Sequence, residues 1–180
     1  MTSDARDWAA ALAGDGRAFA RVFRRDRDRV RRHALALTGA VADAEDVVAV
    51  TFFEAWRHRD RVRFVDDSLE PWLVATATNV ARNLRRSSRR YTELLARLPE
   101  PVAEPEPGAG LGGALPAIAR LPLAERQVAA LCLVAGYSER EAAIALGIPP
   151  GTVKSRLSRA RRRLQEQLRS EGFREETGHA

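Results

Sequence analysis

The chain has 180 residues, of which 45% are hydrophobic and 30% charged, a mixture that excludes wholesale disorder and leaves enough apolar material for a core. Its length suits one ordinary domain or two small helical domains. The formal net charge of +6 at pH 7 indicates a polyanionic partner, either nucleic acid or an anionic membrane surface.

Three helices are predicted before residue 99, because apolar residues recur there at helical spacing. The first ends before Gly39, which supplies a helix stop. The second begins at Asp43 as its N-cap and runs to about His58, and the third has Pro71 in its first turn and continues to about Ser88. The alternating stretch at 61–65 is short and is predicted to be a loop. The apolar face of the first helix comprises Phe19, Val22, Phe23, Val30, Ala34 and Leu37.

The second of these helices has two unlike faces. Its outward face sets the apolar pair Val50 and Phe53 beside the carboxylate of Asp46, which predicts contact with a partner protein. The alternative is that another helix of the same domain covers Val50 and Phe53. The inward face comprises Ala44, Val48, Thr51, Phe52, Ala55 and Trp56.

The helix after Pro71 places a ladder of polar and basic residues opposite its apolar side. Such a ladder can follow a phosphate backbone, and Trp72 with the polar loop at 66–68 could hold unstacked bases. The alternative for Trp72 is an ordinary place in the core. The ladder comprises Thr78, Arg82, Arg85 and Arg89.

Residues 99–113, PEPVAEPEPGAGLGG, contain four of the nine prolines and four of the twelve glycines, so neither helix nor strand can propagate through them. We interpret them as a flexible acidic linker that leaves two modules without a fixed mutual angle. The formal charge is +5 for residues 1–98, −3 for the linker and +4 for residues 114–180. The predicted fold class is therefore all-α, with small helical domains at 1–98 and 114–180.

The second module is predicted to contain a helix-turn-helix. Ser138 and Glu141 form a capping box at the start of its first helix, and Gly147 allows a tight turn. Small Ala143 lets the next helix approach closely, while a wedge of core residues holds the two helices at a steep angle. The wedge comprises Ile144, Ile148 and Val153, and the module's three helices run from Pro122 to Gly136, from Ser138 to Leu146 and from Pro150 to about Leu168.

The last helix combines a buried stripe with an opposite face that carries charge and small polar groups. Such a face can bind phosphates and reach base edges, so we expect it to enter the major groove of DNA. The alternative is a solvated basic face. The predicted stripe is Val153, Leu157, Ala160, Leu164 and Leu168, and the predicted DNA-binding face is Lys154, Ser155, Ser158, Arg159 and Arg162.

Other classes of function find no support in the sequence. Cys132 is the only cysteine, so it can form neither an intrachain disulfide nor a multi-cysteine zinc site, and the three histidines lack metal-ligand spacing. There is no paired carboxylate site beside a histidine, no nucleophile motif and no glycine-rich phosphate loop, so neither enzymatic activity nor a cofactor or metal is expected. No apolar run approaches the roughly 18 residues of a membrane span, and the polar N-terminus is unlike a signal peptide, so we expect a cytoplasmic protein without membrane insertion.

Three strings together resemble one family. DAEDVVAVTFFEAW at 43–56 resembles the polymerase-binding helix of bacterial sigma factors, and PWLVATATNVARNLRRSSRR at 71–90 is similar to their promoter-melting helix. SEREAAIALGIPPGTVKSRLSRARRRL at 138–164 is similar to their helix-turn-helix that reads the minus-35 element. With the two-module layout, the chain resembles the extracytoplasmic-function group of the sigma-70 family over residues 16–98 and 114–168.

This resemblance implies that the chain binds core RNA polymerase and directs transcription from promoter DNA, with an anti-sigma protein as a further partner. The linker would follow the path later taken by nascent RNA. The resemblance implies polymerase contacts at Asp43, Glu45 and Asp46, with Val50 and Phe53 as the apolar part of that surface and a candidate anti-sigma contact. It implies minus-10 contacts at Asn79, Arg82, Arg85 and Arg86, and minus-35 contacts at Lys154, Ser155, Ser158, Arg159 and Arg162.

The chain departs from the family pattern where Ala49 and Val50 replace a common Gln-Glu pair and where the loop before Trp72 reads FVDDSLEP. The first departure means that some polar polymerase contacts are absent or replaced by apolar ones, and the second leaves the flipped minus-10 base undetermined. The main rival is a response-regulator-type helix-turn-helix protein that binds duplex DNA without polymerase. Such proteins usually carry a receiver domain of alternating strands and helices, and residues 1–98 lack that pattern.

Overall fold

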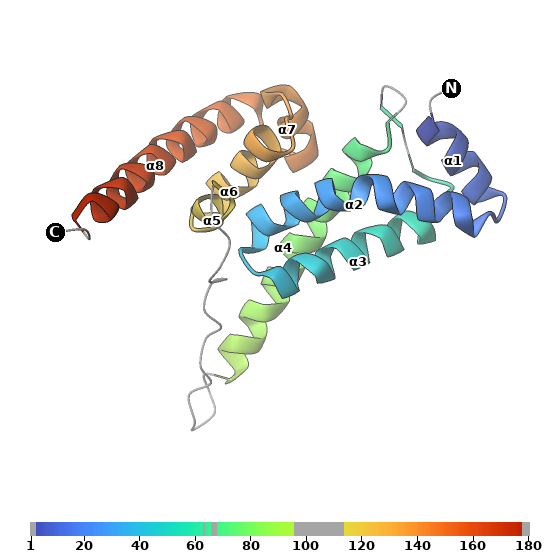
Figure 1. Ribbon diagram of the computed structural model, residues 1–180, viewed down its shortest axis with the longest axis horizontal. Coiled ribbons are helices and arrows are strands. Elements are labelled where there is room, and N and C mark those ends of the chain that lie inside the picture. The colour runs from blue at the N-terminus through green and yellow to red at the C-terminus, as the bar shows by residue number, and fades with distance from the viewer. Residues whose placement is uncertain (1–2, 63, 66–67, 96–113, 178–180) are drawn as a thin grey trace.

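The computed structural model describes residues 3–62, 64–65, 68–95 and 114–177, and this part of the chain is helical throughout apart from its turns and loops. The described residues form four helices before the linker and five helical segments after it, arranged as in Figure 1. The only strand pairing in the described ranges is an isolated bridge between Val65 and Ser68, so the loop prediction for the end of the 61–65 stretch is confirmed and no receiver-type sheet is present there. The helices before the linker are α1 (Ser3–Leu12), α2 (Gly16–Thr38), α3 (Val41–Arg57) and α4 (Glu70–Leu95).

Helix α2 organises the first body because α1, α3 and α4 all pack against it. Asp15 caps its start by accepting a hydrogen bond from the Arg17 N–H, and Gly39 ends it with φ of 78°, a left-handed conformation that glycine adopts without steric cost. The predicted stop at Gly39 is therefore confirmed. The core of this body includes Val22, Val30, Val47, Phe52, Leu73 and Ala77.

Helix α1 is an additional helix that the sequence does not predict. Salt bridges from Arg21 and Arg25 on α2 hold its residues Asp4 and Asp7, and its Trp8 is 4% exposed. The Trp8 indole N–H donates to the Arg59 carbonyl over 3.2 Å. A ten-residue helix is marginal in isolation, so these tertiary contacts are what stabilise it.

Two predicted helix ends are wrong. Helix α3 begins at Val41 after Ala40, which makes no side-chain capping bond, so Asp43 lies in the first turn and favours the helix dipole instead of capping. Helix α4 begins at Glu70 and continues well past Ser88 to Leu95.

The second body contains the helix-turn-helix. Both bonds of the capping box between Ser138 and Glu141 are present, and Gly147 has φ of 65°, which confirms the predicted turn. Ile144 is 76% exposed, so its predicted place in the wedge is wrong; the neighbouring Ala142 and Ala143 face the core instead. The elements of this body are α5 (Ala114–Ala119), α6 (Leu123–Ala129), the π-helical turn η1 (Ala130–Val134), α7 (Glu139–Leu146) and α8 (Pro150–Thr177).

The two bodies pack against each other. His33 of α2 meets the Ala130 carbonyl of η1 at 3.2 Å, and the Tyr137 hydroxyl donates to the Pro71 carbonyl over 3.1 Å. Val74 of α4 is fully buried in the hydrophobic cluster of the second body, with Val128 and Leu131. The sequence did not predict this contact between the modules; the linker itself, residues 99–113, lies outside the described residues.

Candidate nucleic-acid and polymerase interfaces

Helix α8 presents a continuous polar and basic surface. Val153, Leu157 and Ala160 are at most 2% exposed and anchor the helix to the body. Leu168 is 62% exposed and does not continue this stripe as predicted, because α8 projects beyond α5 and α6 toward its C-terminal end (Figure 1). The structure leaves all five residues of the predicted DNA-binding face exposed on this helix: Lys154, Ser155, Ser158, Arg159 and Arg162.

Arg159 is held by an acidic residue that the sequence analysis did not single out. Its Nε atom donates to Oε1 of Glu125 over 3.3 Å, and the Arg163 Nε atom lies 3.0 Å from Oε2 of the same carboxylate. Glu125 comes from α6 and is only 7% exposed. In the sequence it is an acidic residue in the first turn of a helix, which the helix dipole would explain equally well, so no local signal distinguished it.

The exposed side of α4 carries the predicted minus-10 residues. Asn79, Arg82, Arg85 and Arg86 are all exposed, and Arg82 donates to the Asn79 side-chain oxygen over 2.9 Å. Trp72 is only partly buried and packs against the core of the first body. The side chain of Arg89 and the loop residues 66–67 lie outside what the structure describes.

Thr78 does not belong to this exposed side, contrary to the sequence prediction. It is 3% exposed, and its hydroxyl lies 2.8 Å from Nε2 of His33 and 2.9 Å from the Val74 carbonyl. Burial lowers the pKa of His33 to about 4, so the imidazole is neutral at pH 7. Because a carbonyl only accepts, Nδ1 must carry the proton toward Ala130. Nε2 and the Val74 carbonyl are then both acceptors for the single hydroxyl proton of Thr78.

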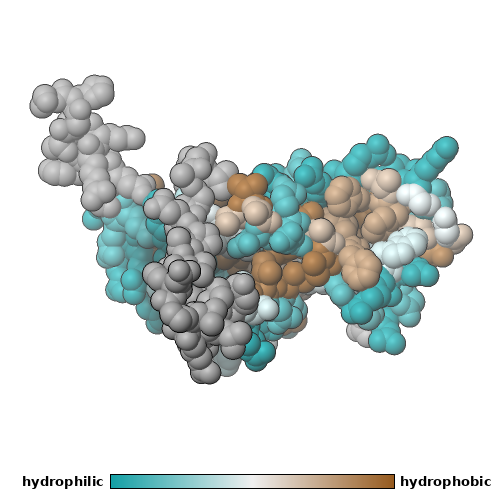
Figure 2. All heavy atoms as spheres, turned by 90° about the horizontal axis from the view of Figure 1, so that it is seen from below, coloured by the Kyte–Doolittle hydropathy of each residue, from teal (hydrophilic) through white to brown (hydrophobic). Residues whose placement is uncertain are grey.

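Helix α3 exposes the apolar pair that the sequence predicted. Val50 is 43% exposed and Phe53 is 61% exposed, so no other helix among the described residues covers them. Together with Glu54, Asn79 and neighbouring residues of α4, Val50 lines a groove of about 610 Å³ between the two helices. Figure 2 shows hydrophobic surface on the lower face of the molecule, bordered by hydrophilic residues.

The three acidic residues predicted to contact polymerase, all near the start of α3, have different environments. Asp43 and Asp46 are exposed. Glu45 instead forms salt bridges with Arg31 and Arg27 of α2, and hydrogen bonds led by that from Arg31 lower its pKa. Glu45 therefore already has partners within the chain.

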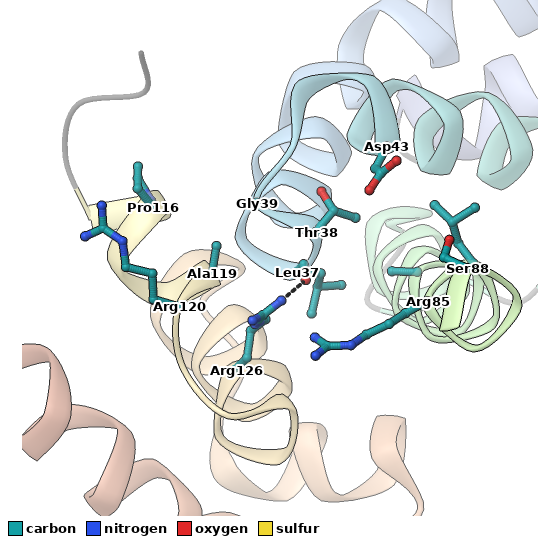
Figure 3. A pocket seen from close by; sticks show the side chains of 12 residues that line it. Leu37, Thr38, Gly39, Asp43, Arg85, Ser88, Pro116, Ala119, Arg120 and Arg126 are labelled. Carbon is teal, nitrogen blue, oxygen red and sulfur yellow. Dashed lines mark hydrogen bonds between the residues drawn. The ribbon is translucent and has the colours of Figure 1, made fainter. Parts of the chain in front are cut away.

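A cavity of about 440 Å³ lies where the two bodies meet (Figure 3). Asp43 and Arg85 border it from the first body, and Arg126 enters it from the second. The Arg126 guanidinium donates to the Leu37 carbonyl over 2.9 Å, and burial together with nearby Arg85 lowers its pKa to about 10. Asp43, a predicted polymerase contact, and Arg85, a predicted minus-10 contact, thus lie beside the second body.

The two bodies match two conserved parts of one protein class. Residues 22–91 match sigma-70 region 2, and residues 115–164 match sigma-70 region 4. The fold and its basic faces therefore define a sigma-70-type transcription initiation factor.

Similar sequences show which group of sigma-70 factors the chain belongs to. The chain is 36% identical over 147 residues to the ECF RNA polymerase sigma factor SigL of Mycobacterium tuberculosis, a match that covers 78% of this chain and 83% of that protein. It is 34% identical over 168 residues to SigM of the same organism, covering 92% and 85%. The chain belongs to the extracytoplasmic-function (ECF) RNA polymerase sigma factors of the sigma-70 family.

Two solved structures are similar along most of the chain. CnrH, in complex with the cytosolic domain of CnrY, has a TM-score of 0.66 and 28% identity, with 94% of this chain and 99% of that chain covered. The sigma factor RpoE of Bartonella quintana, in complex with the anti-sigma factor NepR, has a TM-score of 0.65 and 29% identity, with 84% and 96% covered.

Family membership confirms the predicted activity: the chain binds RNA polymerase and directs promoter recognition, and it is a transcription factor rather than an enzyme. The response-regulator alternative is set aside on the same ground. Among the described helices none combines the length and apolar character needed to span a membrane.

Proposed function

We propose that this sigma factor binds the minus-35 element through the exposed face of α8, the minus-10 strand through α4, and core polymerase through α3. Separate domains at 1–98 and 114–180, joined by the linker at 99–113, would carry these contacts. The main support for the proposal is that α8 has two different faces: Val153 and Leu157 are buried, while Lys154 and Arg159 are exposed. A helix anchored on one side and basic on the other fits a major groove.

The minus-10 assignment depends on the exposed polar side of α4. Arg82, Arg85 and Arg86 supply positive charge for a phosphate backbone, and Asn79 supplies an amide for base edges. The hydrogen bond between Arg82 and Asn79 holds both side chains on the same side of the helix.

The polymerase assignment combines the exposed Val50 and Phe53 with the carboxylates of Asp43 and Asp46, and places Glu45 at the edge of the contact. Apolar side chains ringed by charge are typical of a protein interface. We assign the same apolar pair to an anti-sigma protein, since two similar structures were solved with such a partner or a partner's cytosolic domain. Binding to core polymerase places the protein in the cytoplasm.

Run-off transcription with purified core polymerase on cognate genomic fragments tests the proposal. Lys154→Ala and Arg159→Ala should each weaken use of promoters that depend on the minus-35 element by about 10-fold, because each removes a contact of about 1–3 kcal/mol. Arg169→Ala, an exposed arginine farther along α8, serves as the matched control and should change little. Unchanged upstream selection in both variants would reject the assignment of α8.

A further inference from the structure

Glu125 is a buried carboxylate that forms salt bridges with two arginines of α8. It lies on α6 between Leu121 and Val128, which are at most 1% exposed, and is itself 7% exposed. A buried carboxylate is costly unless charged partners surround it. Arg159 and Arg163 supply those partners from the neighbouring α8, and both are exposed on their outer sides.

The geometry of the pair leaves most of each guanidinium available. Glu125 engages Arg159 through Nε, at 3.3 Å, so both terminal Nη groups remain for an outside acceptor. The Arg163 Nε atom lies 3.0 Å from Oε2 of Glu125. The two groups form a salt bridge, but their geometry is not that of a hydrogen bond. An arginine fixed in this way loses less side-chain entropy when it binds a guanine edge or a phosphate.

We propose that Glu125 is a positioning residue for minus-35 recognition: it orients Arg159 toward a base edge and Arg163 toward the adjacent backbone. The inference rests on the proposed placement of α8 in the major groove. Glu125 itself does not touch DNA and acts through the two arginines.

This role predicts a separation between specificity and affinity. Removing the carboxylate raises the local positive charge, so attraction to duplex DNA of any sequence is maintained or strengthened. The orientation of Arg159 is lost, so discrimination between correct and incorrect minus-35 sequences falls. A merely structural role predicts the opposite, since partial unfolding weakens binding to every sequence.

Glu125→Gln in the full chain with core polymerase provides the test. The ratio of initiation on a promoter with an intact minus-35 element to one with a scrambled element should fall about 10-fold, as for loss of one bidentate base contact. Binding of the free chain to a duplex of random sequence should be unchanged or tighter. Glu166→Gln is the matched control, because the Arg162–Glu166 pair spans 3.9 Å with both side chains well exposed, and it should leave the ratio unchanged.

A second variant covers the case in which Glu125→Gln does not fold, which thermal unfolding would reveal. Glu125→Asp keeps the charge but shortens the side chain, so the discrimination ratio should fall by a smaller factor while nonspecific binding stays at the wild-type level. In a chain that already carries Arg159→Ala, Glu125→Asp should have little further effect on the ratio, because the two residues act as one unit. A wild-type ratio in a folded Glu125 variant, or equal losses on both promoters, would overturn the inference.

The outcome for Arg159→Ala separates this inference from the proposed function. If Arg159→Ala lowers the ratio and the Glu125 variants do not, Glu125 has no positioning role and the placement of α8 stands. If Arg159→Ala and Lys154→Ala have no effect on the ratio, the placement of α8 itself is wrong.

Discussion

Two buried ionisable side chains on α2 respond to pH in opposite directions. Burial lowers the pKa of His33 to about 4, and burial raises the pKa of Asp26, which is 6% exposed, to about 6. Below pH 6.5 the unfolded chain protonates its histidine before the folded chain does, so His33 makes folding less favourable as pH falls toward 4. Asp26 is protonated first in the folded chain, so between pH 6 and 3.8 it makes folding more favourable as pH falls.

The first prediction isolates His33 by removing the opposing carboxylate. In an Asp26→Asn chain, the free energy of unfolding should fall by about 2 kcal/mol between pH 7.5 and pH 5, because the unfolded histidine gains a proton that the buried one cannot. Adding His33→Gln should flatten this dependence, whatever its effect on stability at pH 7.5. Urea denaturation at pH 7.5 and pH 5 measures the free energy of unfolding of both chains. If this free energy changed equally with pH in the chains with and without His33, the lowered pKa of His33 would be contradicted.

At the scale of single helices, one face of α3 packs in the core and stabilises the fold, while the opposite face is exposed and available to a partner protein. Ala44, Val48 and Phe52 are at most 4% exposed and hold the helix in the core. Phe53, the next residue along the chain, points outward and is 61% exposed. A substitution at Phe53 can therefore affect a partner without affecting the fold.

We predict that Phe53→Glu weakens binding to core polymerase by at least about 10-fold, because a charge replaces an apolar anchor at the contact. The free energy of unfolding should change by less than about 0.5 kcal/mol, as is usual for exposed positions. Fluorescence anisotropy with labelled core enzyme measures binding, and circular dichroism melts measure stability. Leu12→Glu on α1, another exposed apolar residue, is the control; equal weakening by both variants would argue against a specific surface on α3.

For the whole molecule, the contact between the two bodies determines how they open. Val74 belongs to the first body in sequence but is buried in the cluster of the second, next to Val128 and Leu131. Arg126 binds the Leu37 carbonyl across the same boundary. A wild-type chain should therefore keep the two bodies together in solution until a partner separates them.

Val74→Ala should lower the stability of this contact by about 2 kcal/mol, through lost burial and a small cavity. The half-buried thiol of Cys132 packs against the hydrophobic cluster that contains Val74 and has a pKa raised mainly by burial, so it reports the opening. Its labelling by a thiol reagent under native conditions should accelerate in Val74→Ala. Val47→Ala, which removes the same atoms within the core of the first body, should accelerate it much less, and equal acceleration would indicate that the bodies do not open separately.

The sequence by itself determined the all-helical fold, the capping box at Ser138, the stops at Gly39 and Gly147, and the exposed faces of α3 and α8. These features depend on residues within a few positions of each other, where periodicity and backbone conformation act directly. Family membership also followed from local strings.

Only the tertiary structure decided which residues meet across long separations in the chain. Burial of Thr78 against His33, exposure of Ile144, docking of α1 through Asp4 and Asp7, and the clamp of Glu125 on Arg159 all depend on how helices pack. Helical periodicity states which residues share a face, but it does not state which helix that face will meet. The packing of the helices determines which residues contact each other, and it brings together two modules that a linker separates in the sequence.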